Sequence, residues 1–204
     1  MLAADALGAD YLGVVLSEGY ARSVSPSSSA ALVEGARARK VAVLVDESAD
    51  GAEERARELG ADVIQLHGDE PPELLAELRR RGAWALWKAV RARSIEDVVR
   101  ALAKHAEVAD GILIEGWREG RPGGGGARLL IDPEELCARV PAELDFVLAG
   151  GMTARTVADA VDRFRPDVVD ASSGIESSEG AKDAELVRRY VASARAAWRG
   201  GRAG

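Results

Sequence analysis

Small residues follow two apolar runs in the last third of the sequence, and their types suit the binding of an anion. "FVLAGGM" ends on Gly150 and Gly151, and "VVDASSGIE" contains Ser172, Ser173 and Gly174. Glycine lets backbone N–H groups approach a ligand that a Cβ would obstruct, and serine hydroxyls add further donors. Either stretch alone is equally typical of an ordinary tight turn. Because the two occur in consecutive loops, we favour a phosphate-binding site.

A carboxylate closes another apolar run. Glu115 ends "GILIE" and stands before the long glycine-rich segment "GWREGRPGGGGARL". One interpretation is a rim charge beside an irregular connection, and the other is a general acid or base beneath a mobile lid. The place of Glu115 at the end of an expected strand favours the acid or base.

Four further polar residues occupy places where they could do chemistry. Arg22, in "GYARSVSP", could fork onto a carboxylate or phosphate, although most loop arginines are only solvated. Gln65 and His67 flank the end of "DVIQLHG", where an amide and an isolated imidazole are more often structural. Lys88 interrupts the apolar run "ALWKAV", an uncommon place for a charge, which favours a function.

The elements that must position these residues alternate along the whole chain. Apolar runs are each followed by a polar or glycine-bearing loop and then by a helical pattern of Ala, Leu, Glu and Arg. The expected strands begin at Tyr11, Lys40, Asp62, Ala85, Gly111, Phe146 and Asp167. Most are continuous apolar runs, as in parallel strands covered on both faces. Ser25 before Pro26, and Asp132 before Pro133, are typical helix starts.

This alternation over 204 residues predicts an α/β protein with a (β/α)8 TIM-barrel fold in a single domain, residues 1–204. The opening "LAADALGAD" is typical of a helix that ends at Gly8, so the strand before it is lacking and strands 2–8 of the barrel are present. A flavodoxin-like open sheet would explain an initial helix without a loss, but it usually has about five strands and ranks second. Barrel active sites lie at the C-terminal strand ends. All of these polar residues are expected there except Lys88, which lies within a strand and points either into the barrel or outward.

Composition excludes several partners. The net charge of −7 and the pI near 5.0, with scattered Lys and Arg, argue against nucleic acid. No apolar run approaches the roughly 20 residues of a membrane span, and the N-terminus lacks the features of a signal peptide, so we expect no membrane partner and a cytoplasmic location. The lone Cys137 excludes an internal disulfide and a multi-cysteine metal site, and its helical context indicates half-buried packing. We expect no metal, and the oligomeric state cannot be read from the sequence.

Several of these segments together resemble one family. They are "GADYLGVVL", "ARSVSP", "DVIQLHGDEP", "KAV", "VLAGGM" and "VVDASSGIESSEGAKD". They are similar to phosphoribosylanthranilate isomerases, the barrel enzymes of tryptophan (aromatic amino acid) biosynthesis, from about Gly8 to the last helix. The resemblance implies an aldose–ketose isomerase that carries out the Amadori rearrangement of N-(5-phosphoribosyl)anthranilate to 1-(2-carboxyphenylamino)-1-deoxyribulose 5-phosphate. It further implies a general acid that protonates the furanose oxygen, a general base that removes the C2 proton, and no cofactor.

The resemblance also implies roles for single residues. The family's phosphate-binding turns are matched by Gly150, Gly151, Ser172, Ser173 and Gly174. Arg22 matches the arginine that holds the anthranilate carboxylate. Strand-end motifs of the family are matched by Gln65, His67 and Asp170, which we add to the substrate-binding residues. Glu115 stands where the family has its general-acid aspartate, so it is the expected catalytic residue for a phosphosugar substrate.

The sequence departs from the family pattern in three places. Glu115 is one methylene longer than aspartate, so either a shifted loop brings it to the ring oxygen or protonation is impaired. The lid pattern "GG-(Ser/Thr)-G" becomes "GGGG" at 123–126, without the Phe-Asp-Trp that normally follows. Nothing aligns with the first-strand "Lys-x-Cys-Gly", whose cysteine is the base. Loss of a positioned base costs roughly 10²–10⁴ in rate, so we expect the gene to encode this strand upstream of Met1.

These departures keep two other hypotheses open. A non-catalytic phosphosugar-binding barrel would suit the altered acid, the altered lid and the absent base. A different phosphosugar isomerase or epimerase on the same barrel is disfavoured by Arg22 and "QLHG". Turnover of phosphoribosylanthranilate indicates the isomerase, whereas saturable product binding without turnover indicates the binding protein.

Overall fold

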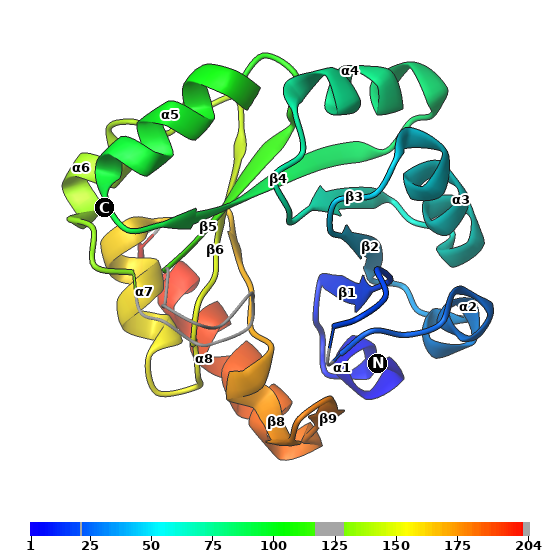
Figure 1. The fold of residues 1–204 in the computed structure, drawn as a ribbon. Coiled ribbons are helices and arrows are strands. Elements are labelled where there is room, and N and C mark those ends of the chain that lie inside the picture. The colour runs from blue at the N-terminus through cyan, green and yellow to red at the C-terminus, as the bar shows by residue number, and fades with distance from the viewer. Residues whose placement is uncertain (21, 117–128, 202–204) are drawn as a thin grey trace. The chain divides into compact units, whose positions relative to one another are not determined.

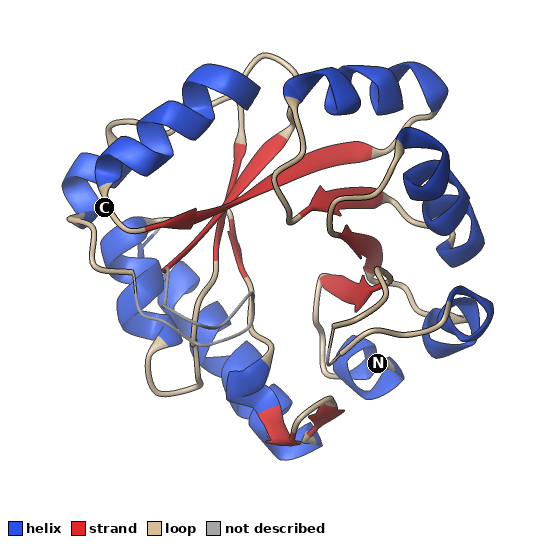
Figure 2. Cartoon of the chain, viewed as in Figure 1, coloured by secondary structure: helices blue, strands red, loops and turns tan. Residues whose placement is uncertain are grey.

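The computed structural model of the chain describes residues 1–20, 22–116 and 129–201. Two compact units make up the chain: residues 1–89 with 107–111, and residues 90–106 with 112–204. Helices and strands alternate in both (Figures 1 and 2). The expected single domain stays a prediction, which a single unfolding transition would support. Within the described ranges, no helix is long and apolar enough to cross a membrane.

The first unit opens on the helix that the sequence predicts. Helix α1 spans Leu2–Ala6 and is followed by Gly8 with a positive φ of 89°. The elements after it are β1 (Tyr11–Val15), α2 (Pro26–Val33), β2 (Arg39–Leu44), α3 (Ala49–Leu59), β3 (Val63–Leu66), α4 (Pro72–Arg81) and the first part of β4 (Ala85–Ala92). The strands pair in chain order and in parallel, with Tyr11 opposite Arg39 and Val63 opposite Ala85.

Local signals set the bounds of these helices, and apolar side chains hold them against the strands. Helix α3 begins after Ser48, whose Oγ accepts a hydrogen bond from the Gly51 amide at 3.2 Å, and it ends at Gly60 with φ 64°. The core of this unit is apolar. Its fully buried residues include Leu44, Ile64, Leu66, Leu75, Leu78 and Leu86. Burial of these side chains stabilises the packing of the helices against the strands.

The second unit continues the same alternation. Its elements are the end of β4, α5 (Ile95–His105), β5 (Gly111–Gly116), α6 (Pro133–Cys137), β6 (Asp145–Leu148), α7 (Val157–Phe164), β7 (Val168–Val169), the 3-10 helix η1 (Ser173–Ile175), β8 (Glu176–Ser178), β9 (Ala181–Lys182) and α8 (Ala184–Gly201). Strands β6 and β7 are parallel, and β8 and β9 form an antiparallel hairpin. Asp132 caps α6 as expected, since its Oδ1 accepts from the Glu135 amide at 3.0 Å.

All of the expected strands are present in the structure, with bounds that shift by a few residues. The last one is shorter than "DVVDA" because only Val168 and Val169 pair with β6. The hairpin of β8 and β9 is not predicted by the sequence, since "ESSEGAK" is polar and lacks the apolar alternation of a strand. The second unit has its own core, which includes Ile114, Leu136, Leu148 and Val157.

Candidate functional site

The two glycine and serine segments of the second unit lie against each other. The turn at 150–151 has two positive φ angles, 101° and 61°, which favour glycine at both positions. The Asp170 amide donates to the Leu148 carbonyl oxygen at 2.9 Å, so the ends of β6 and β7 are neighbours. A Cβ on Gly174 would lie only 1.8 Å from the Met152 carbonyl oxygen, so the backbone at Gly174 packs directly against the backbone at Met152. The two turns therefore have the proximity that a shared anion site requires.

Ser172 is held from within its own loop. It is half-buried at the start of η1, whereas Ser173 is exposed. The ammonium of Lys182 donates to the Ser172 carbonyl oxygen at 3.0 Å and to its Oγ at 3.1 Å. Lys182 also donates to Glu176 Oε1 at 2.7 Å. Lys182 and Glu176 are not predicted as site residues from the sequence, although both belong to the segment "SSGIESSEGAKD".

Glu115 ends a strand that neighbours the first of these turns. The Ala149 amide donates to the Ile114 carbonyl oxygen at 3.0 Å, which places the last residues of β5 beside the residue before Gly150. Glu115 follows Ile114, and its exposure is only 8%. The carboxyl group is therefore at the same strand edge as the turn at 150–151, in a largely dry environment. The lid segment that contains "GGGG" at 123–126 lies outside the described residues.

Gln65 and His67 form a pair at the end of β3 in the first unit. Gln65 is 7% exposed, and its Nε2 lies 2.9 Å from Nδ1 of His67. An amide nitrogen can only donate, so Nδ1 of His67 is the acceptor in this contact. The His67 backbone amide donates to the Leu44 carbonyl oxygen at 2.7 Å, which fixes the residue to β2. Gln65 and the β2 backbone thus hold His67 at the C-terminal end of β3.

Arg22 lies half-buried in the segment after β1. Arg22 lies in a turn, which is closed where the Ser23 amide donates to the Tyr20 carbonyl oxygen at 2.9 Å. Ser23 also forms an isolated bridge with Val15, and its Oγ donates to the Ser17 carbonyl oxygen. These contacts hold the segment of Arg22 at the C-terminal end of β1.

Lys88 has a structural role in this unit. Its side chain is 5% exposed and that of Glu70 is 1% exposed, and the two groups pair at 3.1 Å. The ammonium also donates to three carbonyl oxygens, those of Leu66, Gly68 and Ala89, at 3.2, 2.7 and 3.0 Å. All of its N–H groups are committed to the protein, so the functional interpretation of Lys88 from the sequence is replaced by that of a loop anchor.

Glu70 and Gly68 complete this anchor. The Glu70 carboxylate accepts hydrogen bonds from the amides of Asp46 and Gly68, each at 3.0 Å. A Cβ on Gly68 would lie 2.1 Å from Asp46 Oδ1, an oxygen that already accepts from the Asp69 amide at 2.8 Å. Only glycine fits at position 68 so close to Asp46. The motif "HGDE" therefore indicates a tightly held loop. We call the set Asp46, Gly68, Glu70 and Lys88 the strand-three anchor.

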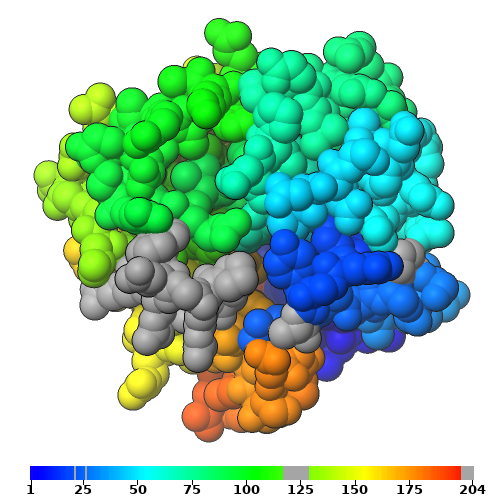
Figure 3. Space-filling model, viewed as in Figure 1, coloured from blue at the N-terminus to red at the C-terminus, as the bar shows by residue number. Residues whose placement is uncertain are grey.

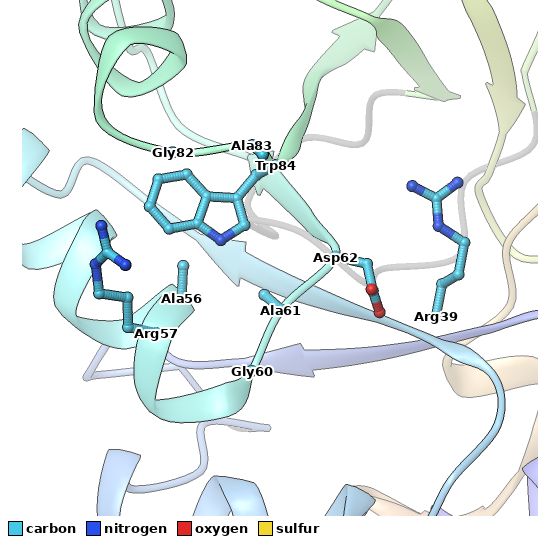
Figure 4. A pocket seen from close by; sticks show the side chains of 9 residues that line it. All are labelled: Arg39, Ala56, Arg57, Gly60, Ala61, Asp62, Gly82, Ala83 and Trp84. Carbon is cyan, nitrogen blue, oxygen red and sulfur yellow. The ribbon is translucent and has the colours of Figure 1, made fainter.

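A pocket of about 520 Å³ lies at the opposite strand ends of the first unit (Figure 4). It is lined by Arg39, Ala56, Arg57, Gly60, Ala61, Asp62, Gly82, Ala83 and Trp84. Arg57 packs over the Trp84 ring, 5.3 Å from its centroid, and also binds Glu53. Asp62 accepts from the Lys40 amide at 2.7 Å. None of the predicted site residues lines this pocket, and N-terminal strand ends in barrels contribute stability rather than catalysis.

Metal and thiol chemistry have no candidates in the described part of the chain. There, no group of three or more His, Cys, Asp or Glu side chains could hold a metal ion. Cys137 is exposed rather than half-buried as predicted. Its sulfur donates to the Phe164 carbonyl oxygen at 3.0 Å, and partial burial of the thiol raises its pKa above the ordinary value. A raised pKa disfavours the reactive thiolate.

Alternating strands and helices, with polar groups and glycine turns after the strands, define this chain as a (β/α)-barrel enzyme. Over residues 1–193 it matches the family described as N-(5'phosphoribosyl)anthranilate (PRA) isomerase. The chain therefore belongs to the PRA isomerase family.

Known relatives agree with this assignment. The N-(5'-phosphoribosyl)anthranilate isomerase of Thiobacillus denitrificans is 38% identical over 192 residues, which cover 93% of this chain and 89% of the relative. The crystal structure of the phosphoribosyl anthranilate isomerase from Thermotoga maritima has a TM-score of 0.82 at 27% identity, covering 96% of this chain and 92% of that one. A PRA isomerase solved in complex with reduced 1-(o-carboxyphenylamino)-1-deoxyribulose 5-phosphate has a TM-score of 0.80 at 28% identity, with the same coverage. The predicted family and barrel fold are confirmed over the flavodoxin-like alternative.

Proposed function

We propose that this chain converts N-(5-phosphoribosyl)anthranilate into 1-(2-carboxyphenylamino)-1-deoxyribulose 5-phosphate, the reaction of its family. Membership of the family supports this assignment, as does a related enzyme that binds a reduced form of that product. The reaction moves hydrogen within one molecule, from C2 to C1, so it needs no external oxidant or reductant. The substrate is expected to be held by its phosphate at one end and by its anthranilate carboxylate at the other.

The turns at 150–151 and 172–174 are our proposed phosphate site. The observation that carries it is the backbone contact between Gly174 and Met152, which keeps two donor-rich turns together. Phosphate oxygens accept hydrogen bonds, and amides beside glycine together with serine hydroxyls can supply them. Fixing the phosphate anchors the sugar, and a well-positioned reacting centre removes much of the entropic part of the barrier.

Glu115 is our proposed general acid. It would donate its proton to the furanose ring oxygen as the C1–O bond breaks, which leaves a protonated Schiff base between C1 and the anthranilate nitrogen. Removal of the C2 proton then moves an electron pair into a C1–C2 double bond and gives the enolamine. Protonation at C1 and loss of the enol proton yield the C2 ketone. We assign no residue of this chain to the base that takes the C2 proton.

The remaining predicted residues are proposed to bind the substrate. Arg22 would bind the anthranilate carboxylate, since a guanidinium matches a carboxylate with two parallel hydrogen bonds. His67, which follows β3 and is held by Gln65, would contact an oxygen of the substrate. Asp170, which follows β7 directly, would accept a hydrogen bond from a sugar hydroxyl.

Substitution of Glu115 by glutamine tests the proposed chemistry. Glutamine keeps the size and hydrogen-bonding oxygen but cannot donate an acidic proton, so we expect kcat to fall by roughly 10²–10⁴ with little change in KM. Consumption of phosphoribosylanthranilate and release of product, separated by chromatography, give both constants. Glu115→Asp is the matched control and should retain most of the turnover. Saturable product binding by a wild-type protein without turnover would instead support the non-catalytic phosphosugar-binding barrel.

A further inference from the structure

The hairpin of β8 and β9 folds back onto the serine turn of the second unit. Glu176 and Lys182 are opposite each other in its register, and the segment lies at the molecular surface (Figure 3). The Lys182 side chain is 29% exposed, whereas that of Glu176 is only 5% exposed. The ion pair of Lys182 and Glu176 is thus in direct contact with Ser172 through Lys182.

The hydrogen bonds of Lys182 determine what Ser172 can do. A lysine ammonium has three N–H donors and no acceptor. The three contacts of Lys182, with the Ser172 carbonyl oxygen, Ser172 Oγ and Glu176 Oε1, use all of these donors. Toward Lys182, Ser172 Oγ must therefore act as an acceptor. Its single hydroxyl proton must then point away from Lys182, where it can be donated to another acceptor.

This arrangement leads to a role for the pair that builds on the proposed phosphate site. We propose that Lys182 is a positioning residue, which orients the Ser172 hydroxyl as a donor to the substrate phosphate, while Glu176 neutralises the lysine charge. Phosphate oxygens without a proton accept hydrogen bonds and cannot return one, so a hydroxyl held as a donor suits them. Because Lys182 has no N–H left for the ligand, its effect on binding passes through Ser172.

The first test measures how tightly the Lys182→Met variant binds phosphate compared with the wild type. We expect the KM for phosphoribosylanthranilate and the inhibition constant of inorganic phosphate each to rise about tenfold, the value of roughly one charge-assisted hydrogen bond, with kcat within about twofold of the wild type. Lys182→Arg, which is also a pure donor, should restore part of the affinity. Lys104→Met, at an exposed position of α5, is the matched control and should change neither constant.

A double-mutant cycle separates this role from simple support of the hairpin. If Lys182 acts through Ser172, Lys182→Met combined with Ser172→Ala should weaken phosphate binding no more than Ser172→Ala alone. Multiplicative effects of the two changes would overturn the proposal. Glu176→Gln keeps an oxygen for Lys182 and adds a net positive charge, so phosphate should bind as tightly or more tightly. A tenfold loss with Glu176→Gln would point to hairpin support alone.

Inorganic phosphate binding by calorimetry keeps this inference distinct from the proposed reaction. The wild type can fail to turn over phosphoribosylanthranilate and still show phosphate binding that depends on Lys182, which refutes the function but retains the positioning role. Conversely, normal turnover with a phosphate affinity that Lys182→Met leaves unchanged refutes only the positioning role. Urea unfolding of each variant shows whether the fold is intact, and Lys182→Arg gives the decisive reading if Lys182→Met unfolds.

Discussion

Each unit contains a lysine–glutamate pair that contacts the backbone of a loop of the proposed site: Lys88 with Glu70, and Lys182 with Glu176. The two pairs differ in burial. In the first unit, the Lys88 and Glu70 side chains are 5% and 1% exposed, and their partners include three carbonyl oxygens and two backbone amides. In the second, Lys182 is 29% exposed, and two of its three partners are atoms of Ser172. Burial of a charge is costly unless every group is satisfied, so the first pair serves the fold. The second, closer to water, can serve a ligand.

The largest effect should come from breaking the buried pair. Lys88→Met leaves the Glu70 carboxylate buried without its counter-charge, so we expect a loss of about 3–5 kcal/mol in the free energy of unfolding. Urea unfolding followed by circular dichroism measures it. The double variant Lys88→Met with Glu70→Met should recover part of the loss, because no unpaired charge remains. A single variant within about 1 kcal/mol of the wild type would show that this pair behaves like an exposed one.

The sequence predicts the elements of both units better than it predicts these pairs. Continuous apolar runs such as "KVAVLV" and "GILIE" define strands, because burial on both faces leaves no other composition. The sequence also predicts that Gly150 and Gly174 are neighbours, because the C-terminal ends of consecutive parallel strands lie at one edge of the sheet. The two lysine–glutamate pairs, by contrast, are in contact only because a loop folds along a particular backbone path.

Lys88 and Lys182 show why the remaining part was not predicted. Lys88 could be seen as unusual, but its partner is Glu70, in "GDEPP", where an acidic residue is typical of a helix start. Lys182 lies in a polar segment that gives no strand signal, so its return onto Ser172 depends on a hairpin that is visible only in three dimensions. Side-chain partners across a loop are a property of its folded path, and the sequence gives only the types of residue available.

A second prediction compares two of the close-packed glycines, Gly68 and Gly174. Gly174→Ala places a Cβ 1.8 Å from a backbone oxygen, that of Met152, whereas in Gly68→Ala the nearest atom, at 2.1 Å, belongs to the Asp46 side chain. Overpacking typically costs about 1–3 kcal/mol, and we expect Gly174→Ala to be at the upper end because a backbone oxygen cannot rotate away. Gly174→Ala should also weaken phosphate binding, whereas Gly68→Ala should leave it nearly unchanged.

The control for this pair of variants is Gly13→Ala in β1. An added Cβ there would meet only Val43 Cγ2 at an ordinary 3.7 Å, so stability should stay within about 0.5 kcal/mol of the wild type. Thermal unfolding and calorimetric titration with inorganic phosphate measure both properties. Equal losses of phosphate affinity in Gly68→Ala and Gly174→Ala would contradict the assignment of the phosphate site to the second unit.

The smallest effect at neutral pH concerns Tyr190, which lies beneath the turn after β6 and donates to Met152 Sδ at 3.9 Å. Burial, with a smaller contribution from the Asp170 carboxylate, raises the pKa of this phenol well above its usual range. A raised folded-state pKa stabilises the fold fully below the ordinary phenol pKa of about 10, and that stability is lost as the pH rises beyond it. The folded protein keeps the phenol protonated, while the unfolded chain releases the proton.

Tyr190→Phe removes this titration, so it separates the packing role of the ring from the ionisation of its hydroxyl. We expect a change below about 1 kcal/mol at pH 7, because a thioether is a weak acceptor, and a smaller loss of stability than in the wild type from about pH 10 upward. Urea unfolding at pH 7 and at pH 10.5 measures the difference, with Tyr20→Phe at an exposed position as the control. If Tyr190→Phe and the wild type lost stability equally over this interval, the phenol would be titrating freely, and the floor beneath the phosphate turn would be open to water rather than dry.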